Sequence, residues 1–102
     1  MAQLIALYRT PADVAAFDTY YFSRHVPLAK TIPGLRRYEV SKGPVGSPTG
    51  ASPYHLVAML HFDSLAAIQQ ALGSAEGTAT AKDLGNFAAA GVELLVFDTK
   101  SV

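Results

Sequence analysis

The chain has 102 residues, of which half are hydrophobic, and its eight basic side chains balance its eight acidic ones. This length predicts a single domain over residues 1–102, and the apolar share is large enough to form a core. No basic stripe is present to meet phosphates, so no nucleic-acid partner is expected. The first residues do not resemble a signal peptide, and no apolar run approaches the ~18 residues of a membrane span, so we expect a cytoplasmic protein without a membrane partner.

The first elements predicted are a buried strand and a helix. Residues 2–9 are apolar on both faces, which favours a central strand. A helix is expected over residues 11–24, with Thr10 as its N-cap and a proline at its first position. We expect it to break near His25, because the residue before Pro27 is pushed out of helical geometry.

The middle of the chain predicts an edge strand, a loop and a central strand. Residues 35–42 carry several charges, which is typical of a strand at the edge of a sheet. Residues 43–53 are rich in glycine and proline and predict a mobile loop. Residues 54–62 alternate, so that Tyr54 and the even-numbered residues after it face one way, and His55 and the odd-numbered residues face the other.

The last part of the chain predicts two helical stretches and a final strand. Ser64 is placed to cap a helix that ends at Gly73. Ser74 is placed to cap a second stretch that we expect to run to about Ala90. The final strand is expected over residues 92–98.

The order of elements, βαββαβ, predicts an α+β fold of ferredoxin-like topology, with helices on one face of an antiparallel four-stranded sheet. The first and third strands are then central and the second is an edge strand. The opposite sheet face has nothing in this chain to cover it, although it carries apolar side chains that include Ile5, Leu7, Val57 and Met59. We therefore expect a homodimer in which two sheets pack face to face.

The first helix presents residues that could carry chemistry. Phe17, Tyr21 and His25 recur every four residues and share with Val14 the face that packs on the sheet. Two aromatic rings and an imidazole on a buried face indicate either a pocket or a core. His25 could be catalytic, or it could be a buried histidine bonded to a backbone carbonyl, and the spacing alone leaves both interpretations open.

The remaining polar residues point to no bound metal and no bound cofactor. His55 and His61 lie six residues apart on the predicted strand, roughly 20 Å, so they cannot chelate one ion together and are expected to line the dimer face. The arginines Arg36 and Arg37 could bind an anion, but charges on an edge strand also prevent unwanted strand pairing. The sequence contains no G-x-S-x-G elbow and no phosphate-binding glycine loop.

Two motifs resemble the signature of the EthD family, which belongs to the dimeric α+β barrel superfamily. They are Tyr20-Tyr21-Phe22-Ser23-Arg24-His25-Val26-Pro27-Leu28-Ala29 and Ile32-Pro33-Gly34-Leu35-Arg36-Arg37-Tyr38. The family is named for a protein required in bacterial degradation of ethyl tert-butyl ether, and the resemblance implies a dimeric barrel with a pocket between helices and sheet in each subunit. His25 matches the family's histidine. Relatives in the superfamily include cofactor-free monooxygenases, isomerases and haem-binding enzymes, but the late helical histidine of the haem binders has no counterpart here.

The leading hypothesis is an enzyme without a bound cofactor, either a monooxygenase-like oxidoreductase or an isomerase, that acts on a small apolar or aromatic molecule. His25 would be the acid or base, and Tyr21 or Tyr8 would donate a hydrogen bond to a developing oxyanion. The predicted apolar wall consists of Phe17, Leu60, Phe62 and Phe87. The alternative is a non-catalytic protein that binds a small metabolite in a degradation pathway, and a purely structural dimer with a filled core is a third possibility.

Overall fold

The computed structural model describes all residues from 1 to 102. In chain order its elements are β1 (Ala2–Arg9), α1 (Val14–Tyr20), the π-helical turn η1 (Tyr21–His25), α2 (Val26–Ala29), β2 (Arg37–Val40), β3 (Gly46–Ser47), β4 (Gly50–Ala51), β5 (Tyr54–Phe62), α3 (Leu65–Gly73), α4 (Ala75–Asp83), the 3₁₀ turn η2 (Leu84–Asn86) and β6 (Val92–Asp98).

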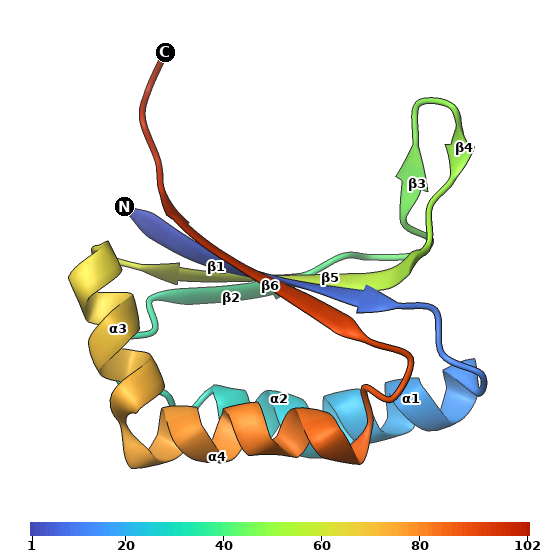
Figure 1. Cartoon of the computed structure of the whole chain (residues 1–102), viewed down its shortest axis with the longest axis horizontal. Helices are drawn as coiled ribbons and strands as arrows, with labels where there is room; N and C mark the ends of the chain where they lie inside the picture. The colour runs from blue at the N-terminus through green and yellow to red at the C-terminus, as the bar shows by residue number, and fades with distance from the viewer.

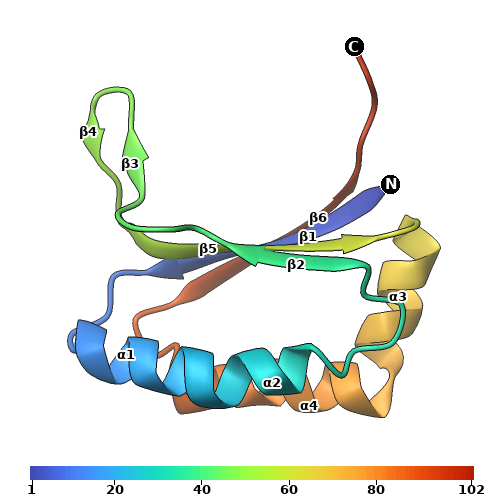
Figure 2. The same cartoon turned by 180° about the vertical axis from the view of Figure 1, so that it is seen from behind.

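Four strands form one antiparallel sheet in the order β2-β5-β1-β6, which confirms the predicted α+β ferredoxin-like fold. The predicted positions of the strands are also confirmed, since β1 and β5 are central and β2 lies at an edge. All helices lie on one side of this sheet, whereas the β3–β4 hairpin and the C-terminal residues extend from the other side (Figures 1 and 2). One sheet face is therefore covered and the other is open.

The core lies between the sheet and the helices. Alternate residues of the two central strands face the helices and are buried. On β1 these are Ala2, Leu4, Ala6 and Tyr8, and on β5 they are Leu56, Ala58, Leu60 and Phe62. The residues between them face the open side and are only half buried. This alternation follows from the two-residue period of a strand, and it leaves an apolar surface on the open face.

The alternation predicted for residues 54–62 is wrong at its first two residues. The register of β1 against β5 shifts by one residue, so that Arg9 pairs with Tyr54 and His55 becomes the extra residue of a bulge. The bulge directs His55 toward α1, where its Nε2 lies 2.7 Å from Asp18 Oδ1. His55 and His61 therefore do not share a face, contrary to the prediction.

The start of the first helix also differs from the prediction. Asp13, not Thr10, is its N-cap, because the Asp13 carboxylate accepts a hydrogen bond from the Ala16 N–H at 3.0 Å. The Thr10 hydroxyl instead donates to the carbonyl oxygen of Pro53. Val14 consequently lies on the first exposed turn and is 42% exposed, although Phe17, Tyr21 and His25 are buried as predicted.

The helix does not break at His25. The Val26 N–H donates to the carbonyl of Tyr21, five residues earlier, so the chain forms a π-helical turn through His25. Pro27 then lies at the start of α2, where its missing N–H costs little. The π-helical turn thus lets the helical backbone continue past Pro27, which was expected to end the helix. This turn contains His25.

The later helices begin where predicted, and one ends early. Ser64 and Ser74 each accept a hydrogen bond, both at 3.0 Å, from the backbone N–H three residues on, so both predicted caps are confirmed. The second helical stretch ends at Asn86 and does not reach Ala90. Gly85, in its last turn, disfavours continuation. No helix in this structure is long and apolar enough to cross a membrane.

Gly77 of α4 packs directly against the end of α3. A Cβ atom at this position would lie 2.0 Å from the carbonyl oxygen of Ala71, so Gly77→Ala would force the two backbones apart. We expect this substitution to lower the free energy of unfolding by about 1–3 kcal/mol, the usual cost of overpacking. Thermal denaturation followed by circular dichroism measures it, with Gly73→Ala as the control, since nothing lies within 4 Å of that position. Equal melting temperatures for the two variants would contradict the packing argument.

Candidate active site

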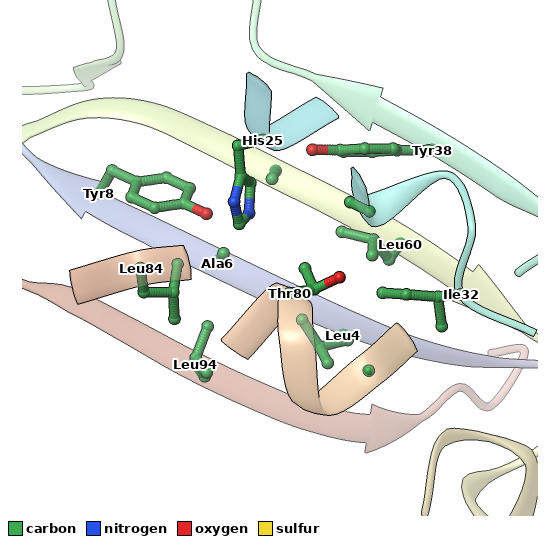
Figure 3. Close-up of a pocket in the computed structure, with 13 residues that line it drawn as sticks. Leu4, Ala6, Tyr8, His25, Ile32, Tyr38, Leu60, Thr80, Leu84 and Leu94 are labelled. Atoms are coloured by element: carbon green, nitrogen blue, oxygen red, sulfur yellow. The ribbon is translucent and has the colours of Figure 1, made fainter. Parts of the chain in front are cut away.

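A cavity of about 60 Å³ lies between the helices and the sheet. Its wall is mostly apolar, and the polar groups that it contains are His25, Tyr8, Tyr38 and Thr80 (Figure 3). The Thr80 hydroxyl donates within its own helix, to the carbonyl of Glu76, so the imidazole and the two phenols are the groups left to meet a ligand. Leu94, on the edge strand β6, lines the cavity and is also 49% exposed.

His25 and Asp83 form the central pair of this site. His25 is 3% exposed, and its Nδ1 lies 2.8 Å from Asp83 Oδ2. The other carboxylate oxygen of Asp83 accepts hydrogen bonds from the Tyr20 hydroxyl at 2.6 Å and from the Asn86 amide at 3.0 Å. Three donors from two parts of the chain therefore fix the carboxylate, and the carboxylate fixes the imidazole.

The protonation of the pair follows from its surroundings. Burial lowers the pKa of His25, although the hydrogen bond to Asp83 acts in the opposite direction. Burial alone would raise the pKa of Asp83, but the hydrogen bonds from Tyr20, Asn86 and His25 outweigh it and the net pKa is lowered. At neutral pH the carboxylate is thus ionised and the imidazole is neutral. Nδ1–H donates to Asp83, and Nε2 keeps a free lone pair, since the ring makes no other hydrogen bond within the chain.

The lowered pKa of His25 makes the stability of the fold depend on pH. Below about 6.5, the ordinary pKa of histidine, the unfolded chain takes up a proton that folded His25 does not. The free energy of unfolding should therefore fall as the pH decreases from 6.5 toward the folded pKa. Urea denaturation over this range measures the slope, which should be smaller in His25→Asn. An unchanged slope in that variant would mean that the titration of another group causes the pH dependence of stability.

Three tyrosines stand beside the imidazole. The hydroxyls of Tyr21 and Tyr38 lie 2.6 Å apart, and the Tyr8 ring packs edge-on against Tyr21. Burial is the main cause that raises the pKa of all three phenols, so they remain protonated hydrogen-bond donors. Tyr8 and Tyr38 line the cavity, whereas Tyr21 is fully buried behind them. The site therefore offers one basic nitrogen and two phenol hydroxyls to a molecule in the cavity.

The structure brings together only some of the residues expected at the site. His25, Tyr8 and Leu60 line the cavity, and Tyr21 reaches it through its hydroxyl contact with Tyr38. The three phenylalanines of the predicted apolar wall are not part of the cavity lining, which consists of Leu4, Ala6, Tyr8, His25, Ala29, Ile32, Tyr38, Ala58, Leu60, Gly77, Thr80, Leu84 and Leu94.

Each of these phenylalanines has another place. Phe62, at the end of β5, is 1% exposed in the core. Phe17 and Phe87 line a different hollow, between α1 and the segment that follows η2. Phe87 nevertheless covers the His25 ring, with 4.6 Å between the ring centroids, and so shields the imidazole from water on that side.

Asp83 and Tyr38 are site residues that the sequence interpretation did not include. Asp83 had a detectable signal, because Gly77, Thr80 and Asp83 recur every three residues and form the buried stripe of α4. A carboxylate on such a stripe needs a buried partner. Tyr38 had no such signal, since it lies on a polar edge strand.

The cationic side chains lie away from the cavity. Arg36 forms a paired contact with Asp63, at 2.7 Å for its shortest distance, and Arg37 contacts Glu39 at 2.9 Å. No lysine or arginine lines the cavity. No group of three His, Asp or Glu side chains is placed so that it could hold a metal ion.

The chain therefore combines a ferredoxin-like α+β fold with a buried His–Asp pair beside an apolar cavity between the helices and the sheet. A family model described as the EthD domain matches residues 9–91, and the chain belongs to the EthD family.

Similar proteins agree with this assignment. An uncharacterized 11.0 kDa protein of the thcB–thcC intergenic region of Rhodococcus erythropolis is 40% identical over 104 residues, which cover 100% of this chain and 98% of that protein. The crystal structure of an EthD family protein from Bacillus halodurans has a TM-score of 0.90 and 41% identity, over 98% of this chain and 99% of that one.

Two solved structures of lower identity share the fold. One is SnoaB, a cofactor-independent oxygenase from Streptomyces nogalater, with a TM-score of 0.68 and 16% identity over 99% of this chain and 94% of that one. The other is a dimeric ferredoxin-like protein of unknown function from Thermobifida fusca, with a TM-score of 0.69 and 15% identity over 96% of this chain and 90% of that one. At these identities the likeness extends to the fold alone.

Proposed function

We propose that this protein is a cofactor-independent enzyme that uses His25 as a base on a small apolar or aromatic molecule. The observation that carries the proposal is the His25–Asp83 pair: the imidazole lines an apolar cavity (Figure 3), and its Nε2 makes no hydrogen bond within the chain. A neutral imidazole oriented by a carboxylate is an effective base at neutral pH.

The reaction begins with a proton transfer. Nε2 takes a proton from a C–H or O–H bond of the substrate, and the bonding electron pair stays on the substrate as an enolate or phenolate. Asp83 stabilises the imidazolium that forms, and the hydroxyls of Tyr8 and Tyr38 donate hydrogen bonds to the oxyanion. If His25 returns the proton to a different atom, the net reaction is an isomerisation. If the anion instead reacts with dioxygen, the net reaction is an oxygenation, the class of reaction named for SnoaB.

The charges around the cavity favour a neutral substrate. No cationic side chain lines the cavity, and the ionised Asp83 lies next to it. Burying a carboxylate there without a partner would cost several kcal/mol. Phenols, enols and lactones should therefore bind in preference to carboxylic acids of the same size.

We also propose that two copies associate through their open sheet faces. Leu95 and Phe97 of β6 are 49% and 40% exposed on this face and extend the apolar surface of the central strands. On the same face, His61 Nε2 lies 3.4 Å from Glu39 Oε1 and makes no well-formed hydrogen bond within the chain. A second sheet would cover the apolar surface. The T. fusca protein of the same fold is dimeric, which supports association of two copies.

The proposal is tested by proton exchange in D₂O. Small neutral carbon acids, such as unsaturated lactones and cyclic ketones, are incubated with the protein, and NMR follows the replacement of C–H by C–D. We expect exchange above the buffer rate together with a ligand-induced rise in melting temperature. A rise in melting temperature without exchange for any compound would favour a protein that binds a metabolite without turning it over.

A further inference from the structure

Tyr20 contacts the same carboxylate as His25, although five residues separate the two along the chain. The Tyr20 hydroxyl donates to Asp83 Oδ1 at 2.6 Å, and His25 Nδ1 lies 2.8 Å from Asp83 Oδ2. In an α-helix, at about 100° per residue, side chains five residues apart point roughly 140° away from each other. An uninterrupted α-helix would therefore not bring both side chains to Asp83.

The π-helical turn η1 brings the two side chains to one face. It starts directly after Tyr20 and ends at His25, and the Val26 N–H donates to the carbonyl of Tyr21. A turn closed by a hydrogen bond over five residues is wider than an α-helical turn, so residues five apart return to nearly the same side. The turn thus explains how a tyrosine and a histidine of one helical segment hold the two oxygens of one carboxylate.

The Tyr20 side chain is fixed on the side of the pair that is away from the cavity. Its ring stacks on Phe87 at 5.4 Å between centroids, and Phe87 also covers the imidazole at 4.6 Å. Asn86, the neighbour of Phe87, donates to the same Oδ1 at 3.0 Å. Tyr20 does not line the inner cavity, the one beside His25, so it can act on a ligand there only through Asp83.

The Tyr20 hydroxyl also changes the charge that the imidazole meets. Burial by itself raises the pKa of Asp83, and the hydrogen bond from Tyr20 is the strongest of the contacts that lower it. A donor on Oδ1 draws negative charge away from Oδ2 and so weakens the attraction of the carboxylate for the imidazole proton. The exposed Arg24 does not shift the pKa of His25. The other ionisable groups around the ring are phenols that stay protonated, those of Tyr8, Tyr21 and Tyr38.

We propose that Tyr20 is a positioning residue of the site, which acts through Asp83 to hold the imidazole with its proton on Nδ1 and so leaves Nε2 as the base. The π-helical turn is the feature of the fold that makes this contact possible. The inference rests on the proposed role of His25, and it adds the residue that sets the orientation and the basicity of the imidazole.

The test variant is Tyr20→Phe, which removes the hydroxyl and keeps the ring that stacks on Phe87. With one donor fewer, Asp83 stabilises the imidazolium more strongly, so the pKa of His25 should rise in a ¹⁵N NMR titration. The pH profile of the proton-exchange rate should move to higher pH with it. We expect kcat on the plateau of that profile to fall about tenfold, since a base displaced by ~1 Å loses up to ~100-fold. KM should change little, because Tyr20 does not touch the ligand.

Tyr54→Phe is the matched control. The Tyr54 hydroxyl also donates to a carboxylate, that of Glu93 at 3.1 Å, but at the surface and away from the cavity. This variant should leave the pKa of His25 and kcat as in the wild type. Asn86→Ala removes the other side-chain donor from Asp83 Oδ1 and should also raise the pKa of His25, which keeps the test available if Tyr20→Phe does not fold.

The NMR titration separates this inference from the proposed function, because it requires no turnover. A raised pKa of His25 in Tyr20→Phe supports the positioning role even if the wild type exchanges no proton with any substrate. An unchanged or lower pKa of His25 in Tyr20→Phe and in Asn86→Ala, or an equal rise in Tyr54→Phe, would overturn the inference.

Discussion

Replacing His25 with Asn should reduce the rate of catalysed proton exchange by about 10²–10⁴-fold, the usual contribution of a positioned base. The amide of Asn can still donate a hydrogen bond toward Asp83, so the carboxylate keeps a partner and the fold should persist. What is lost is the basic lone pair of Nε2. The measurement is the rate of C–D formation by NMR, with circular dichroism to confirm that the variant is folded.

His55→Asn is the matched control for this experiment. His55 also contacts a carboxylate, with 2.7 Å between its Nε2 and Asp18 Oδ1, but it lies at the bulge of β5 and does not line the inner cavity. Its replacement should leave the exchange rate within about twofold of the wild type. Equal losses in the two variants would show that His25 has no special role as a base.

Replacing Ile5 with Lys should convert the expected dimer into a monomer. Ile5 pairs with Met59 on one side and Leu95 on the other, at the middle of the open sheet face. In a face-to-face dimer the substitution would bury two lysines close to the symmetry axis, and like charges in an interface cost several kcal/mol. We expect the dissociation constant to rise at least a hundredfold, as measured by sedimentation equilibrium.

Gln70→Lys adds the same charge on the exposed side of α3 and should leave the dimer intact. A wild-type chain that sediments as a monomer at micromolar concentrations would refute the face-to-face arrangement. A dimer that tolerates the lysine at position 5 would locate the interface elsewhere.

The fold was predictable because its strands differ so clearly in polarity. Residues 2–9 and 54–62 are apolar enough to be central, and the charged residues 35–42 fit only an edge. Such patterns are local and have a fixed period. The errors arose where a contact distant in sequence changes the local geometry, as when the bulge at Arg9 directs His55 toward α1. The π-helical turn is a similar case. The backbone restriction that proline places on the residue before it predicted a break in the helix, whereas the chain forms a wider helical turn instead.

The candidate site was only partly predictable for the same reason. The four-residue spacing that leads to His25 lies within one helix and can be counted. Its partner Asp83 comes from a helix 58 residues later, and only the packing of α2 against α4 brings the two together. The cavity wall depends on how far along each strand the helices reach. Alternation identifies the face of Leu60 and Phe62 but not which of them meets the cavity.

The most direct test of the account is the ¹⁵N NMR spectrum of the His25 imidazole as a function of pH. We predict a neutral ring at pH 7 with the proton on Nδ1, a pKa below 6.5, and a shift of the Nε2 resonance when a neutral phenol binds. A ring that is already protonated at pH 7, or that carries its proton on Nε2, would contradict the assignment of His25 as a base aimed into the cavity.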